Sequence, residues 1–142
     1  QNDVWFSSTA DNGAVWTLRT ALAEWTGRSQ SGVLVVSDNT LLFGGESAGG
    51  LQNDVWVSAS AANGQVWTLK TASAAWGITR YPAVVSAGGG IVLHSGYLGG
   101  HSNQVWFSAD AGVTFTAKTT SAGFPSRSGI GFYVDQNGGL VA

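Results

Sequence analysis

The chain has 142 residues, 44% of them hydrophobic and 10% charged, and a formal net charge of -2. Because the charged fraction lies far below the roughly 25% of typical globular proteins and no basic cluster occurs, a nucleic-acid partner is disfavoured. The absence of cysteine excludes disulfides, thiolate metal sites and a cysteine nucleophile, and the longest apolar runs, at 32–36 and 40–43, are too short for a membrane-spanning helix.

The same pattern occurs three times, in blocks of about fifty residues, which indicates a tandem β-repeat. Each block opens with a strand rich in β-branched and aromatic residues, at 2–7, 53–58 and 103–108. Apolar residues fall on both faces of these strands, as expected for sheets that pack on neighbours on either side. A turn follows in each block, at 11–13, at Ala62-Asn63-Gly64 and at 110–112, where asparagine, aspartate and glycine tolerate positive φ.

The rest of each block supplies three more strands. A second strand is predicted at 15–20, 66–71 and 114–119, followed by a connector of small residues and a strand rich in glycine, serine and valine. A further strand ends at Phe43 before Gly44 and Gly45, and at His94 before Ser95 and Gly96. Three positions recur: Trp16, Trp67 and Phe115 in the second strand, Trp25, Trp76 and Phe124 in the connector, and Arg28, Arg80 and Arg127 after it.

These landmarks, in this order, resemble the kelch repeat. Its marks are a Gly-Gly pair closing one strand, a Val-Trp in the next, a spaced tryptophan and then an arginine, and they occur in two complete frames and part of a third. The resemblance covers the whole chain. It implies an all-β fold, namely a β-propeller built from four-stranded antiparallel blades of about 50 residues.

The repeat boundaries predict an incomplete propeller. They divide the chain into a half-blade at 1–20 (third and fourth strands), full blades at 28–71 and 80–119, and a half-blade at 127–142 (first and second strands). Three blades cannot close a ring, since propellers usually have four to eight, so the rest of a six- or seven-bladed ring must come from elsewhere. Two sources stay open. The first is a longer chain, since a sequence that lacks methionine and begins at Gln1 is expected to be a processed product or an excerpt. The second is another copy of this chain, so that a twofold-symmetric pair makes a six-bladed ring.

Residues 108–115 resemble a second motif, the Asp-box Ser-x-Asp-x-Gly-x-Thr-Trp, with Ser108, Asp110 and Gly112 in place and Phe115 for the tryptophan. The motif implies a propeller and is known from sialidases. Its short side chains can hydrogen-bond their own turn, which is a structural role. The arginines give no sialidase-like cluster either, because Arg28, Arg80 and Arg127 hold one equivalent place each. We expect them to bond carbonyls or acids within and between blades.

The seven tryptophans are predicted to be core residues that pack blade against blade. They hold three repeat positions: Trp5, Trp56 and Trp106 in the opening strand, Trp16 and Trp67 in the next strand, and Trp25 and Trp76 in the connector. Because Trp25 and Trp76 lie in connectors, stacking of these two rings on a sugar is the alternative.

Binding is best sought where the copies differ. In an up-and-down blade, the loop between strands two and three emerges at the same face as the connector between blades. That face, which we call the loop face, carries the non-repeated polar residues and the connector tryptophans: Glu24, Trp25, Glu46, Trp76, Tyr97 and His101. The alternative interpretation is that these polar residues are solvated loop residues without a ligand, because loops are polar by default. His94 replaces Phe43 at a strand end and is expected to be held by core hydrogen bonds.

No spacing in the sequence gives a nucleophile-base-acid set, a phosphate loop or paired carboxylates, and two histidines make a poor metal site. We therefore predict no catalytic residue, metal or cofactor. The function predicted is a non-enzymatic propeller scaffold that mediates protein–protein interaction or assembly through the loop face and its blade edges. Two alternatives stay open: a carbohydrate-binding or sialidase-like glycan-processing propeller, and a structural subunit of a filament or coat.

Overall fold

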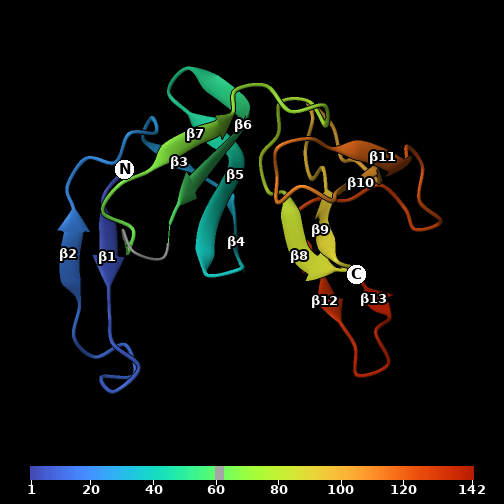
Figure 1. Cartoon of the computed structure of the whole chain (residues 1–142). Helices are drawn as coiled ribbons and strands as arrows, with labels where there is room; N and C mark the ends of the chain where they lie inside the picture. The colour runs from blue at the N-terminus through green and yellow to red at the C-terminus, as the bar shows by residue number, and fades with distance from the viewer. Residues whose placement is uncertain (60–62) are drawn as a thin grey trace.

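The computed structural model describes residues 1–59 and 63–142, and within them the fold is all-β, without a helix (Figure 1). The predicted turn at 62–64 includes Ala62, which lies outside the described residues. Across the same two ranges, nothing helical is long and apolar enough to span a membrane.

In the described ranges, the strands form four antiparallel sheets in chain order. An N-terminal hairpin contains β1 (Val4–Phe6) and β2 (Thr17–Thr20), and a C-terminal hairpin contains β12 (Tyr133–Val134) and β13 (Leu140–Val141). The central sheet contains β3 (Arg28–Ser29), β4 (Gly32–Val36), β5 (Asn39–Ser47), β6 (Gly50–Ser58) and β7 (Thr68–Thr71). The third sheet contains β8 (Ala83–Ala87), β9 (Gly90–His94), β10 (Val105–Ser108) and β11 (Thr116–Thr119).

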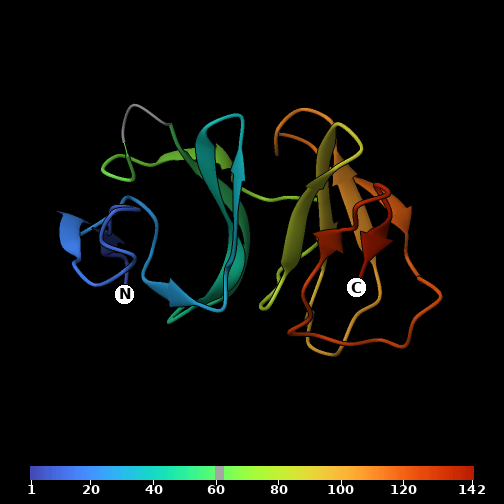
Figure 2. The ribbon, with the colours of Figure 1, turned by 90° about the horizontal axis from the view of Figure 1, so that it is seen from below.

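The N-terminal hairpin, the central sheet and the third sheet follow one another in a row across Figure 2, and the C-terminal hairpin lies against the third sheet, where β12 contacts β8. The contacts between sheets run from β4 to β8 and from β8 to β12. No sheet closes on itself within the described residues. The pairings repeat even in their irregularities, because β1, β6 and β10 each shift register at the bond before the tryptophan, between Val4 and Trp5, Val55 and Trp56, and Val105 and Trp106.

The core lies between the sheets, and β5 supplies it on both faces. Leu41 and Phe43 point to one side, where they join Ile91 and Leu93 of β9, while Leu42 points to the other. Successive side chains of a strand alternate between faces, so a strand buried on both sides needs a continuous apolar run. The run at 40–43 therefore packs against neighbours on both faces of β5.

Connector aromatics join one sheet to the next. Trp25 follows β2 and packs edge-on against Trp67 of the central sheet, with ring centroids 6.0 Å apart. Trp76 follows β7 and packs edge-on against Phe115 of the third sheet, with ring centroids 4.5 Å apart. Each connector ring thus contacts the aromatic residue that leads into the last strand of the following sheet.

The prediction that all tryptophans are core residues is wrong for the N-terminal hairpin. Trp25, Trp67 and Trp76 are buried and Trp56 and Trp106 are partly buried, but Trp5 is 50% exposed and Trp16 is 58% exposed. The reason is positional. Among the described residues, no sheet covers the outer face of this hairpin, whereas each equivalent tryptophan further along the chain has the preceding sheet beside it.

The Gly44–Gly45 pair is required by the crowding where β5 bends. Gly44 has φ +51° and Gly45 has φ +101°, conformations that residues with a Cβ rarely adopt. A Cβ on Gly45 would also lie 2.7 Å from the carbonyl oxygen of Ser29 and collide with the Ser31 hydroxyl. Both residues are buried, so the chain leaves no room for a side chain at this bend.

Candidate functional site

Antiparallel pairing places several loops at one end of the third sheet. Val105, which begins β10, pairs both with His94, which ends β9, and with Thr119, which ends β11. The loop at 95–104 and the connector after Thr119 therefore emerge together. The opposite end of the sheet carries the turn at 88–89 and the turn that contains Asp110. The strand-parity argument for a shared loop face thus agrees with the pairing in this sheet.

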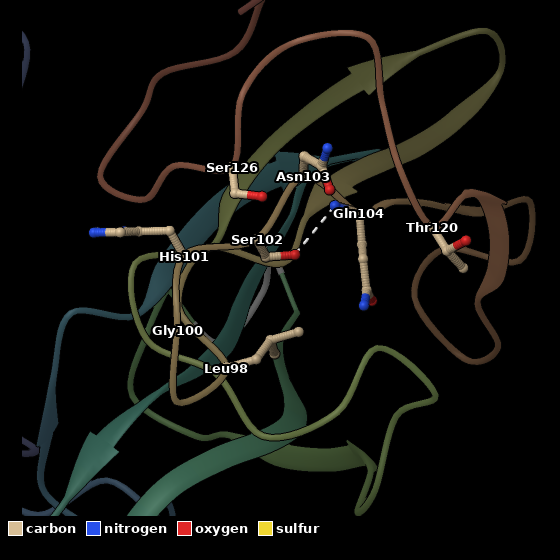
Figure 3. Close-up of a pocket in the computed structure, with 8 residues that line it drawn as sticks. All are labelled: Leu98, Gly100, His101, Ser102, Asn103, Gln104, Thr120 and Ser126. Carbon is tan, nitrogen blue, oxygen red and sulfur yellow. Dashed lines mark hydrogen bonds between the residues drawn. The ribbon is translucent and has the colours of Figure 1, made fainter.

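A small open pocket of about 240 Å³ lies at this end, between the loop and the connector (Figure 3). The Ser102 hydroxyl accepts a hydrogen bond from the backbone N–H of Gln104 at 3.1 Å and so shapes the loop wall. The lining is mainly polar, with one apolar side chain, and comprises Leu98, Gly100, His101, Ser102, Asn103, Gln104, Thr120 and Ser126. Of these, the sequence analysis had singled out His101.

Asn103 fixes the connector that forms the far wall. Its amide Nδ2 donates to the carbonyl oxygens of Ala122 at 3.0 Å and Phe124 at 3.3 Å. Asn2 and Asn53 hold their own connectors in the same way. The sequence analysis did not assign this role, although the recurrence of asparagine at one place in all three copies was the signal for it. Each connector is therefore clipped back to the sheet it leaves.

Three predicted residues of the loop face are brought together through Arg80. The Arg80 guanidinium donates to the Glu46 carboxylate at 2.6 Å and lies over the Tyr97 ring at 4.6 Å from its centroid. The Tyr97 ring meets the His101 ring edge-on at 5.9 Å, and His101 Nδ1 lies 3.0 Å from the Ser128 hydroxyl. Glu46, Tyr97 and His101 thus belong to one continuous row on the surface. The hydrogen bond to Glu46 raises the pKa of Arg80 and keeps its charge in place.

Arg80 differs from Arg28 because its repeat lacks the matching acid. Arg28 bonds bidentately to Asp54 in its own sheet, at 2.5 and 2.9 Å, and is buried. The residue equivalent to Asp54 in the third sheet is Gln104, which carries no charge. Arg80 pairs instead with Glu46 of the central sheet, where the side chains are 30% and 37% exposed. Because Gln104 stands where the central sheet has Asp54, Arg80 pairs with Glu46 and becomes part of the row at the surface.

The other loop-face predictions are corrected by burial and bonding. Trp25 is 7% exposed and Trp76 is 1% exposed, so neither ring offers a face on which a sugar could stack. The Glu24 carboxylate accepts a hydrogen bond from the backbone N–H of Trp67 at 2.9 Å, which ties the first connector to the central sheet. These three residues join sheets together and do not line the pocket.

The Asp-box-like turn is closed on itself. The Asp110 carboxylate accepts hydrogen bonds from the Thr114 hydroxyl at 2.6 Å and from the Thr114 N–H at 2.9 Å, and the Ser108 hydroxyl donates to it at 2.7 Å. Led by the Thr114 hydroxyl, these bonds lower the pKa of Asp110 to about 2. Gly112 packs toward Leu41 of the central sheet. The partners of the Asp110 carboxylate are all local, as expected for a turn-forming role, while the Thr71 hydroxyl of the central sheet donates to the Gly112 carbonyl at 3.1 Å. The turn lies at the end opposite the pocket.

His94 is fully buried and both ring nitrogens are bonded. The backbone N–H of Gly96 donates to Nδ1 at 3.2 Å, so the ring proton sits on Nε2 and donates to the Ser102 carbonyl at 3.0 Å. His94 therefore anchors the pocket loop from below as a neutral imidazole. Elsewhere in the described ranges, His, Asp and Glu side chains nowhere gather in threes, as they would around a metal ion.

We expect acid to destabilise the protein through His94. Burial lowers the pKa of this imidazole below the usual value near 6.5, and the positive charge of Arg127 acts in the same direction against the opposing Ser102 bond. The unfolded chain therefore binds this proton at a higher pH than the folded chain. The free energy of unfolding should fall as the pH drops below about 6.5, by at most about 1.4 kcal/mol per pH unit.

Urea unfolding between pH 7.5 and 5 measures this slope. His94→Phe, which copies Phe43 of the central sheet, should remove His94's share of the slope, whereas His101→Phe on the exposed ring should leave it. Equal slopes for the parent chain and His94→Phe would contradict the assignment.

A scan against protein-family models and a search of curated proteins both return no match for this chain.

Proposed function

We propose that the chain is a kelch-like β-propeller segment that serves as a binding scaffold for a protein partner. The propeller is supported by antiparallel sheets that follow one another along the chain, the third with four strands and the central one with the two-residue β3 as a fifth, and by the connector aromatics that join them at equivalent places. The binding surface is the pocket together with the row formed by Arg80, Tyr97 and His101.

The observation that carries this proposal is the composition of that surface. Tyrosine and arginine are enriched among the few residues that carry most of the binding energy at protein interfaces, because they combine a large apolar area with a polar end. Here the Arg80 guanidinium lies over the Tyr97 ring, 4.6 Å from its centroid, and donates a hydrogen bond to Glu46. These side chains are partly ordered before a partner arrives, which lowers the entropic cost of binding.

The pocket also favours a protein partner over a small-molecule substrate. Its volume of about 240 Å³ lies below the roughly 300–1,000 Å³ of typical ligand pockets and suits one inserted side chain.

His101 and Ser128 lie at hydrogen-bond distance, as a base and a nucleophile would. Among the described residues, however, no carboxylate hydrogen-bonds the His101 ring to orient it. The pair thus supports recognition better than acyl transfer.

Site-specific photo-crosslinking tests the surface. A photoreactive residue is placed at His101, and at Ser86 near the opposite end of the same sheet, and each protein is exposed to extract from the cells that produce it. We expect a discrete crosslinked protein from position 101 and none from position 86. The partner, once purified, should bind Tyr97→Ala and His101→Ala about tenfold more weakly than the parent chain in calorimetry.

Ser86→Ala serves as the matched control and should bind like the parent chain, because Ser86 is exposed away from the pocket. Equal crosslinking from both positions would contradict the proposal. Selective binding on a glycan array, lost in Tyr97→Ala, would replace a protein partner with a carbohydrate.

A further inference from the structure

The central sheet contains a largely buried group of three side chains, Arg28, Asp54 and Trp56, that joins β3 to β6. Arg28 of β3 donates two hydrogen bonds to Asp54 of β6 and a third to the Gly44 carbonyl at 3.0 Å. Asp54 also accepts from the indole N–H of Trp56 at 2.7 Å. The arginine side chain is 2% exposed, so the charges are enclosed and depend on each other.

Both halves of this group occur again, separated, at the two ends of the row. In the N-terminal hairpin, Asp3 accepts from the indole N–H of Trp5 at 2.7 Å, as Asp54 does from Trp56. Before the C-terminal hairpin, Arg127 Nε donates to the Pro125 carbonyl at 3.0 Å, as Arg28 donates to Thr26. Within the described part of the chain, neither Asp3 nor Arg127 has an ion-pair partner.

The aromatic contacts are divided in the same way. Trp76 packs between Phe43 of the sheet before it, at 6.2 Å, and Phe115 of the sheet after it. Phe124, its equivalent, contacts His94 of the sheet before it at 5.8 Å. The residue that would complete this stack is the equivalent of Phe115 in the N-terminal hairpin, which is Trp16, and its ring is 58% exposed. Phe124 and Trp16 are thus the two rings that would meet in a third copy of this aromatic contact.

The hairpin edges match in register. In the central sheet, Phe43 pairs with Val55 and Leu42 with Trp56, and in the third sheet His94 pairs with Val105 and Leu93 with Trp106. By the pairing of β12 with β13, Val141 is equivalent to Leu42. If β13 of one copy pairs with β1 of another copy as β5 pairs with β6, Val141 lies opposite Trp5 and Leu140 lies opposite Phe6. Leu140 and Trp5 are exposed in the single chain, so this pairing would bury both.

We propose that the C-terminal hairpin of one copy and the N-terminal hairpin of a second copy form one four-stranded sheet. Arg127 then pairs with the partner's Asp3, and Phe124 packs on the partner's Trp16. The proposal rests on the propeller architecture proposed above. Two copies related by a twofold axis make two such sheets, which with two complete sheets from each copy gives a ring of six.

Charge reversal tests the pairing, with the solution mass measured by light scattering. The parent chain should have twice its monomer mass, while Arg127→Asp and Asp3→Arg should each associate roughly 100-fold more weakly, because like charges then face each other. When the two variants are mixed, both junctions regain opposite charges, so a mixed dimer should form that neither variant forms alone. The double variant should dimerise by itself.

Lys118→Asp is the control, since Lys118 lies on β11 away from both hairpins and makes the same change of charge. It should dimerise like the parent chain. A folded parent chain that stays monomeric at every concentration would overturn the proposal, as would failure of the mixed variants to dimerise while circular dichroism shows both to be folded. Neither result bears on the crosslinking test of the loop face, so the two proposals can fail separately.

Discussion

Replacing Trp76 by alanine should lower the free energy of unfolding by about 3–5 kcal/mol, the range for large aromatic residues removed from a core. Trp76 is 1% exposed and contacts Phe43 in the central sheet and Phe115 in the third sheet. Its loss leaves a cavity at the joint between the two sheets, which their backbones cannot close without moving apart. Urea unfolding followed by circular dichroism measures the change.

Two controls separate packing from a general effect of changing the connectors. Trp76→Phe copies Phe124 at the same repeat position and should lose about half as much as Trp76→Ala. Leu22→Ala, at a side chain that is 79% exposed in the first connector, should change the free energy of unfolding by less than about 0.5 kcal/mol. If Trp76→Ala is as mild as Leu22→Ala, the connector aromatic does not join the sheets.

A second large loss in the free energy of unfolding is expected for Gly45→Ala, at about 2–6 kcal/mol. One part is backbone strain, of roughly 1–3 kcal/mol, because the φ of +101° is unfavourable for alanine. The other part, again of roughly 1–3 kcal/mol, is a clash with the Ser29 carbonyl oxygen and the Ser31 hydroxyl in a buried bend. Thermal and urea unfolding of the purified variant give the total.

Gly50→Ala separates the two parts, since it has a similar φ of +105° but no atom within 4 Å of an added Cβ. It should show only the strain, near 1–3 kcal/mol. Equal losses for Gly45→Ala and Gly50→Ala would mean that the bend has room for a methyl group and that the crowding argument is wrong.

Strands and turns could be predicted from the sequence because local chemistry determines them. The β-branched and aromatic runs predict strands, and asparagine and glycine occupy positive φ at the first predicted turn, at Asn12 and Gly13. The apolar run at 40–43, which the sequence shows to be of strand length, lies in β5. None of these features depends on residues far away in the chain.

The candidate site was harder to predict because it depends on which side chains of different repeats the fold brings into contact. From the sequence position alone, Arg28 and Arg80 were expected to have the same structural role. Arg28, however, has the buried acid Asp54 beside it, whereas the equivalent position in the repeat of Arg80 is Gln104. Only the fold brings Glu46 within reach of Arg80. Likewise, Trp25 lies in a loop by sequence, yet it is buried because the next sheet supplies Trp67 as a neighbour.

Among the described residues, the central sheet contacts the third sheet and the third sheet contacts the C-terminal hairpin, and this serial arrangement affects how such a chain can change in evolution. The two joints on either side of the central sheet use the same parts, an aromatic residue from one repeat and an aromatic residue from the next. Duplication or deletion of one whole repeat therefore adds or removes one joint and leaves the others as they were. Changes in length by whole repeats preserve every interior contact, whereas an insertion within a strand would disturb two joints at once.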